Sequence, residues 1–242
     1  MTEVDPALAG LHIVGWAGGR VVVDEVLPHG VDVDDLLAEH GWRATDVRET
    51  TGRLGVDLAA HFDLGPHPVV PRPPRRGVVD EGVDPEGANV LRRQRVAAYV
   101  FASSDRGWLM CELSGRTRSP GLWTLPGGGM DPGETAAEAV HREVWEETSQ
   151  EVELGELVAV ATFSWVGRWG GRAPLGTVQD HHAVRLVHVG RCARPSEPRV
   201  LEVGGSTSAA RWVTDMELAQ LPVVDSWAQI LPAVTGVVPS SW

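Results

Sequence analysis

The segment between residues 131 and 156 carries a dense cluster of negative charge that constrains how the chain can fold. It contains nine carboxylates and one arginine, Arg142, and so supplies −8 of the formal net charge of −12. Acidic side chains within a few helical turns repel one another and destabilise a helix unless a cation lies near them. A solvated acidic surface helix would explain the charges alone. It would not explain the three glycines, Gly127 to Gly129, that precede them.

The spacing within this segment predicts one helix with a buried face and a carboxylate face. A capping box over residues 135–138 places the start of the helix near Ala136. At about 100° per residue, Glu143, Glu146 and Glu147 share one face. Three neighbouring carboxylates suit a hard divalent cation such as Mg²⁺, which prefers oxygen ligands and often binds substrate phosphates as well. The residues expected to be buried on the other face are Ala137, Val140, Val144 and Thr148.

Arg142 and the glycine loop extend this candidate site. A guanidinium can bind two carboxylate oxygens at once and so orient a glutamate for proton abstraction. Glycines leave backbone groups open to close approach by a metal or a phosphate. Together, the helix face, Arg142 and the loop at 126–129 predict a site for a metal-bound polyphosphate.

These residues closely resemble the Nudix box of the MutT-like (Nudix) hydrolase superfamily. The box reads glycine, five residues, glutamate, seven residues, then Arg-Glu-apolar-x-Glu-Glu-x-Gly-apolar. The flanking segment "LWTLPGGGMDPGE" is also similar to the usual approach to the box. The positions of this chain that match the box are Gly128, Glu134, Arg142, Glu143, Val144, Glu146 and Glu147.

Two positions depart from the pattern. Ser149 replaces the glycine and Gln150 replaces the following apolar residue. Glycine ends a helix in a left-handed conformation that costs serine about 1 kcal/mol. The departure therefore affects the end of the helix and removes no ligand.

The resemblance implies an α+β fold, namely a Nudix α/β/α sandwich with a mixed sheet, and a hydrolase that uses Mg²⁺ or Mn²⁺. Such enzymes cleave a nucleoside diphosphate linked to another group. By position in the box, Glu146 and Glu147 are implied metal ligands. Glu143 is implied as a further ligand or as the general base, with Arg142 holding it. The carbonyl of Gly127 is a further implied metal ligand.

Other implied site residues lie outside the central motif. Glu134 is expected to stabilise the junction of loop and helix, or to reach a second metal through water. Glu202 is the candidate for an acidic ligand from a later loop, with Asp180 as its rival. Trp169 and Arg168 are the candidates for stacking on a base and binding phosphate.

Pattern changes along the chain predict three parts. Residues 1–64 read as a small βαββ-like unit of unknown role, with one strand near 19–28, a helix with an aspartate N-cap near 32–42, and two extended segments joined at Gly52. Residues 65–89 are rich in proline and glycine and read as a linker. Residues 90–242 read as the Nudix domain, with strands on both sides of the acidic helix and a last helix near 223–234.

The composition of the chain limits the classes of partner that it is expected to bind. The net charge of −12 argues against nucleic acid or an anionic membrane as a general partner. The start of the chain lacks a signal-peptide pattern and no long apolar run is present, which predicts a cytoplasmic protein. Cys111 and Cys192 are far apart and are expected to be free buried thiols.

The sequence therefore predicts a pyrophosphohydrolase that acts on a small-molecule nucleotide: a nucleoside triphosphate, nucleotide sugar or dinucleotide. The alternative is a non-catalytic Nudix-fold sensor that binds a nucleotide without cleaving it. The sequence also leaves open whether the N-terminal unit mediates a homodimer or shapes the pocket.

Overall fold

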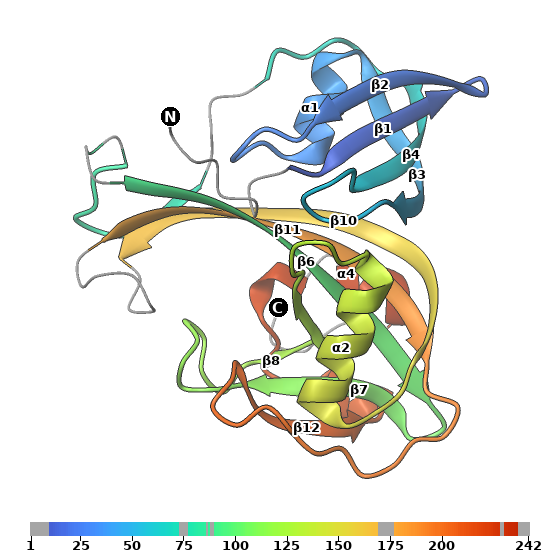
Figure 1. The fold of residues 1–242 in the computed structure, drawn as a ribbon, viewed down its shortest axis with the longest axis vertical. Coiled ribbons are helices and arrows are strands. Elements are labelled where there is room, and N and C mark those ends of the chain that lie inside the picture. The colour runs from blue at the N-terminus through green and yellow to red at the C-terminus, as the bar shows by residue number, and fades with distance from the viewer. Residues whose placement is uncertain are drawn as a thin grey trace. The chain divides into compact units, whose positions relative to one another are not determined.

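The first quarter of the chain folds into a small sheet that carries one helix. The computed structural model describes residues 10–72, 77–85, 87, 90–168, 177–227 and 230–236 (Figure 1). The N-terminal sheet has the strand order β2-β1-β4-β3. β1 pairs with β2 antiparallel and with β4 parallel, and β3 pairs with β4 antiparallel, so the sheet is mixed. Its elements are β1 (His12–Ala17), β2 (Arg20–Val26), α1 (Val33–Glu39), β3 (Trp42–Thr51) and β4 (Ala59–Pro66).

Local sequence explains most of this unit. The Asp32 side chain accepts a hydrogen bond from the Asp34 backbone N–H and caps α1, as the sequence predicts. Leu36 and Leu37 on α1 are fully buried. β3 ends at Thr51, and Gly52 then adopts a φ of 76°, which glycine tolerates without strain.

Strand β1 is an addition to the predicted βαββ pattern. Gly15 interrupts its apolar run, and a glycine inside a strand normally weakens it. In the structure the Leu64 side chain of β4 occupies the space beside Gly15 that a Cβ would need. The glycine therefore permits close packing between neighbouring strands, a cause that lies outside the local sequence.

The second sheet is larger and has the order β12-β7-β6-β11-β10-β5, with β8 paired to β7 and β9 paired to β6. β12 and β7 are antiparallel and β10 and β5 are parallel, so this sheet is also mixed. The three longest strands, β6, β11 and β10, are neighbours in this order. The strands are β5 (Val78–Val79), β6 (Val90–Ser104), β7 (Gly107–Leu113), β8 (Trp123–Thr124), β9 (Gly127–Gly129), β10 (Glu153–Arg168), β11 (Val178–Arg191) and β12 (Thr207–Val213).

The chain divides into two units. Unit 1 contains residues 1–97, 129–136 and 160–186, and unit 2 contains residues 98–128, 137–159 and 187–242. Each of the long strands β6, β10 and β11 contributes residues to both.

Unit 2 has helices on both faces of its strands, with α2 (Ala136–Thr148) toward the viewer in Figure 1 and α4 (Ile230–Thr235) behind. An apolar cluster of this unit joins strand residues such as Phe101 and Val187 to Trp227 and Leu231 near the C-terminal end. The α+β fold with a mixed sheet is thus as predicted.

Three smaller predictions can be compared with the structure. Instead of one last helix near 223–234, the chain forms a short 3-10 turn at Asp225–Trp227 and then α4. Cys111 and Cys192 are free and buried, as predicted. Across the described residues, no helix combines the length and the apolar character that a membrane span requires.

Candidate active site

Arg142 links two of the three clustered carboxylates on α2. Its Nη1 atom lies 2.8 Å from Oε1 of Glu143 and 3.4 Å from Oε2 of Glu146. α2 begins at Ala136, where the capping box predicted it. Val140, Val144 and Thr148 are buried as expected, but Ala137, in the first turn, is exposed, and Ala136 and Ala139 are buried instead. The helix therefore buries its apolar face and holds Glu143 and Glu146 on one arginine.

The glycine loop is shaped around the carboxylates. A Cβ on Gly128 would lie 2.6–2.7 Å from the carboxylate atoms of Glu143, so only a glycine leaves this space open. Gly127 has a φ of 135°, and a Cβ there would collide with the carbonyl oxygen of Ala98. Both glycines are thus fixed by close contacts, and Gly128 allows Glu143 to rest on the loop.

Glu147 is the most buried carboxylate of the helix, with 2% of its surface exposed. Its Oε2 accepts a hydrogen bond of 3.0 Å from the Gly127 N–H, and its Oε1 accepts one from the Thr207 hydroxyl. Burial raises the pKa of Glu147 to about 7, against the effect of these two hydrogen bonds. Burial, followed by the nearby Glu147 carboxylate, also raises the pKa of the Cys111 thiol.

These contacts separate the carboxylates that the sequence placed together. Among the described residues, no three Asp, Glu, His or Cys side chains are grouped closely enough to hold a metal ion. Arg142 forms ion pairs with Glu143 and Glu146. Glu147 instead accepts hydrogen bonds from Gly127 and Thr207. The donor set still fits a hard divalent cation by its chemistry. All three side chains offer carboxylate oxygens, and each accepting oxygen of Glu147 keeps a further lone pair.

The two candidates for a later acidic ligand belong to different units. The backbone N–H groups of Leu201 and Glu202 both donate to the Glu146 carbonyl, at 2.8 and 3.1 Å. The backbone of Glu202 is therefore held at the Glu146 carbonyl of α2, and its carboxylate lies against Gly205. Asp180 belongs to unit 1, where it is 1% exposed and its Oδ1 lies 3.2 Å from Nε2 of His29.

Glu134 lies in unit 1 and closes a short turn. Its Oε2 accepts a hydrogen bond of 2.7 Å from the Asp131 N–H, and its own N–H donates to the Asp131 carbonyl. This contact supports the first of its two expected roles, at the junction of loop and helix. The role in binding a second metal stays a prediction.

A hollow of about 440 Å³ lies in unit 2, beside Thr207. Arg116 is exposed at this hollow, and a Cβ on Gly204 would lie 3.2 Å from its guanidinium. Sequence reasoning missed Arg116, because one arginine in a polar loop carries no spacing signal. The residues lining the hollow are Ser114, Gly115, Arg116, Val200, Glu202, Val203, Gly204, Gly205, Thr207 and Ser208.

The predicted base-stacking pair is only partly visible. Arg168 is exposed at the last position of β10. Trp169 lies outside the described residues. The structure therefore leaves the expected substrate contacts of this pair as a prediction.

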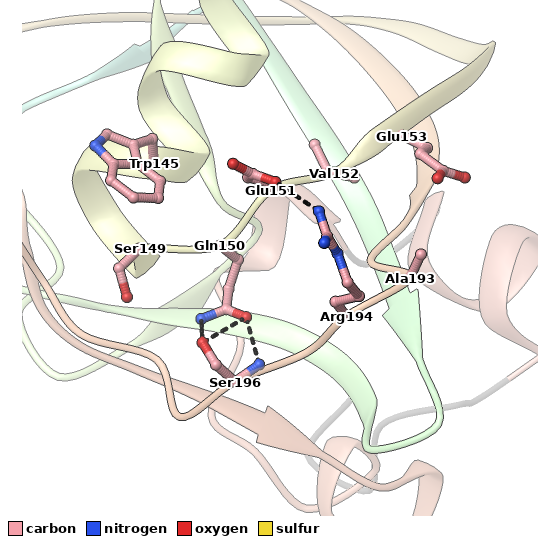
Figure 2. Close-up of a pocket in the computed structure, with 9 residues that line it drawn as sticks. All are labelled: Trp145, Ser149, Gln150, Glu151, Val152, Glu153, Ala193, Arg194 and Ser196. Carbon is pink, nitrogen blue, oxygen red and sulfur yellow. Dashed lines mark hydrogen bonds and ion pairs between the residues drawn. The ribbon is translucent and has the colours of Figure 1, made fainter.

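The two departures from the box lie at the end of α2, beside a second hollow of about 400 Å³ in unit 2 (Figure 2). Ser149 has a φ of 55°, the left-handed conformation that the family's glycine would adopt there. Gln150 is 3% exposed, and its amide hydrogen-bonds with Ser196: Oε1 accepts from the backbone N–H at 2.9 Å and Nε2 lies 2.9 Å from Oγ. A buried polar group thus replaces the apolar residue of the pattern with its hydrogen bonds satisfied.

Comparisons with known proteins agree with the motif. Nucleoside triphosphatase NudI of Enterobacter sp. (strain 638) is 41% identical over 63 residues, which are 26% of this chain and 45% of that protein. Nucleoside triphosphatase NudI of Escherichia coli O1:K1 is 38% identical over 66 residues, 27% of this chain and 47% of that protein. The chain thus spans about half the length of these curated relatives.

Among solved structures, a MutT NUDIX hydrolase from Burkholderia pseudomallei is similar to this chain with a TM-score of 0.44 and 26% identity. The similarity covers 59% of this chain and 99% of that one. A family model for the NUDIX domain matches residues 91–234. Because this match covers more than half of the chain and includes the whole box, the chain belongs to the NUDIX domain family.

Proposed function

We propose that this chain is a divalent-cation-dependent hydrolase of a phosphoanhydride bond in a nucleoside diphosphate derivative. One observation carries the proposal. Gly128 leaves room for the Glu143 carboxylate, and Arg142 bridges Glu143 to Glu146 on the same helix. A helix that only needed a soluble surface would not require a glycine packed under a carboxylate.

The acidic side chains of the site have different roles in this proposal. Glu146 and Glu147 hold Mg²⁺ or Mn²⁺, with the Gly127 carbonyl and Glu202 as further ligands. Glu143 acts as a ligand or as the base for the attacking water, and Arg142 fixes its orientation. The bound cation lowers the pKa of water and neutralises charge on the phosphate oxygens.

The hollow beside Thr207 is the proposed place for the substrate's phosphates. Arg116 is its cationic group, and the backbone at Gly204 and Gly205 allows close approach. Arg168 and Trp169 remain the proposed contacts for the base. The names of the two NudI relatives make nucleoside triphosphates the first compounds to test.

The experiment is phosphate and pyrophosphate release in Mg²⁺ from a panel of compounds. The panel contains ribo- and deoxynucleoside triphosphates, oxidised triphosphates, ADP-ribose, dinucleotides, diadenosine polyphosphates and nucleotide sugars. Glu146→Gln is the catalytic control, and EDTA followed by added Mg²⁺ or Mn²⁺ tests the metal. We expect turnover of one class, its loss in Glu146→Gln, and recovery only when a divalent cation returns.

Two outcomes of this panel would contradict the proposal. Tight nucleotide binding without turnover, in the presence of either metal, would identify a non-catalytic sensor. Turnover that is unaffected in Glu146→Gln would move the reaction to another site.

A further inference from the structure

Within unit 1, a turn of the N-terminal sheet is hydrogen-bonded to the loop of the Nudix box. The N–H of Leu54 donates to the Glu134 carbonyl at 2.9 Å, and the N–H of Gly133 donates to the Leu54 carbonyl at 2.7 Å. Nη1 of Arg53 donates to the Gly133 carbonyl at 2.7 Å. Both backbone polar groups of Gly133 are therefore bound by residues 53 and 54.

The turn that makes these contacts is itself well fixed. The Asp57 carboxylate accepts a hydrogen bond from the Arg53 N–H, and the Asp57 N–H donates to the Arg53 carbonyl. Gly52 packs so closely on the Asp57 backbone that a Cβ could not fit. Leu54 is 2% exposed, so its side chain anchors the turn in the apolar core.

The bound loop is the part of the box that leads into α2. Gly133 has a φ of 88°, a conformation that this loop must hold. Glu134 follows at once and is closed onto Asp131, and α2 begins two residues later at Ala136. The hydrogen bonds from residues 53 and 54 therefore fix the backbone from which the carboxylate-bearing helix starts.

We propose that the N-terminal unit is part of the catalytic apparatus, because Arg53 and Leu54 set the conformation of Gly133 and Glu134. Arg53 is a positioning residue: it acts on the carboxylates of α2 through the backbone at the start of that helix. This rests on the hydrolase function proposed above. It gives residues 1–64 a role that their sequence does not indicate, since two of the three contacts use only the backbone of the turn.

The first test measures kcat and KM of the full chain in Mg²⁺, with the nucleoside triphosphate that the wild type turns over fastest. The variants are Arg53→Ala, Arg53→Lys and, as a matched control, Arg48→Ala. Arg48 lies on the same sheet but pairs with Asp63 and stacks over Trp16. We expect Arg53→Ala to lower kcat about tenfold, since a hydrogen bond from a charged donor contributes about that factor, with little change in KM. Arg53→Lys should recover part of the loss, and Arg48→Ala should behave as the wild type.

The second test follows amide hydrogen exchange and needs no activity. In the wild type the amides of Leu54 and Gly133 should exchange slowly and at similar opening rates, because each donates to the other's segment. Arg53→Ala should speed both about tenfold. The Met130 amide, which donates to the Val96 carbonyl instead, should be unaffected.

The outcomes separate the two proposals. Unprotected amides at Leu54 and Gly133 in the wild type would overturn the inference, whatever the activity. Protected amides with an unchanged kcat in Arg53→Ala would refute the positioning role while the hydrolase function stands. If the proposed hydrolase function is itself wrong, the wild type will show no turnover, while its Leu54 and Gly133 amides remain protected.

Discussion

The carboxylate face of α2 and its C-terminal end lie on one helix, yet the Nudix pattern is kept on the first and broken at the second. On the face, Gly128, Arg142 and the three glutamates match the pattern and contact one another or their loop. At the end, Ser149 and Gln150 depart from it. The backbone at Ser149 is strained, and the buried Gln150 amide is satisfied by hydrogen bonds to Ser196. The residues of the face are therefore constrained by the chemistry of the site, and those at the end only by the stability of the fold. Substitutions at the two places should therefore change different quantities.

The largest expected effect is on the face, in Glu147→Gln. Loss of one charged oxygen ligand should lower kcat in Mg²⁺ by about 100-fold or more. The free energy of unfolding should change by less than about 1 kcal/mol, because removal of a buried charge offsets the loss of one hydrogen bond. Steady-state kinetics and urea denaturation on the same preparation measure both. A variant that is strongly destabilised but keeps the kcat of the wild type would reverse the assignment of this face.

Gly128→Ala tests the contact between the loop and Glu143. The added Cβ would lie 2.6–2.7 Å from the carboxylate atoms, so the carboxylate must move. A displacement of about 1 Å at a catalytic group costs up to about 100-fold in rate. We expect kcat to fall by about 10- to 100-fold, measured beside the thermal midpoint. Unchanged kinetics would mean that the Glu143 carboxylate does not take part from this position.

At the other end of the helix, Gln150→Leu restores the apolar residue of the family pattern but should destabilise the protein. The substitution removes the hydrogen bonds between the buried Gln150 amide and Ser196, and a hydrogen bond of this kind contributes about 0.5–1.5 kcal/mol. We expect a loss of about 1 kcal/mol in the free energy of unfolding with kcat unchanged. Gln220→Leu, an exposed position, is the control and should have little effect. A more stable Gln150→Leu would show that the hydrogen bonds to Ser196 contribute nothing.

The same contrast explains what the sequence could predict. Helix α2, most of its buried face and the glycine loop follow from spacing alone, because each depends on residues close in sequence. The exception on the buried face is Ala137, which is exposed. The N-cap at Asp32 was predicted for the same reason. Ser149 adopts the left-handed conformation that was expected of the family's glycine.

What the sequence could not predict depends on contacts between distant segments. Glu147 turns to Thr207, 60 residues away, so the three carboxylates do not converge as helix geometry suggested. Strand β1 depends on Leu64 packing over Gly15. The hydrogen bonds between residues 53–54 and 133–134 are mostly backbone contacts, which leave no pattern in side-chain types.

The smallest expected effect is a gain in stability in Ser149→Gly. Ser149 has a φ of 55°, where the Cβ of any residue other than glycine is crowded, and the helix ends at the preceding residue. Glycine removes this strain but loses more backbone entropy on folding, so the net gain should be about 0.5 kcal/mol, or about 1–2 °C in the thermal midpoint. Ser149→Ala keeps the Cβ and should give no gain. Because neither substitution changes a carboxylate side chain of the site, kcat should be unchanged in both variants. If Ser149→Gly altered kcat, the end of the helix would be tied to the catalytic face, and the division between the two regions would be wrong.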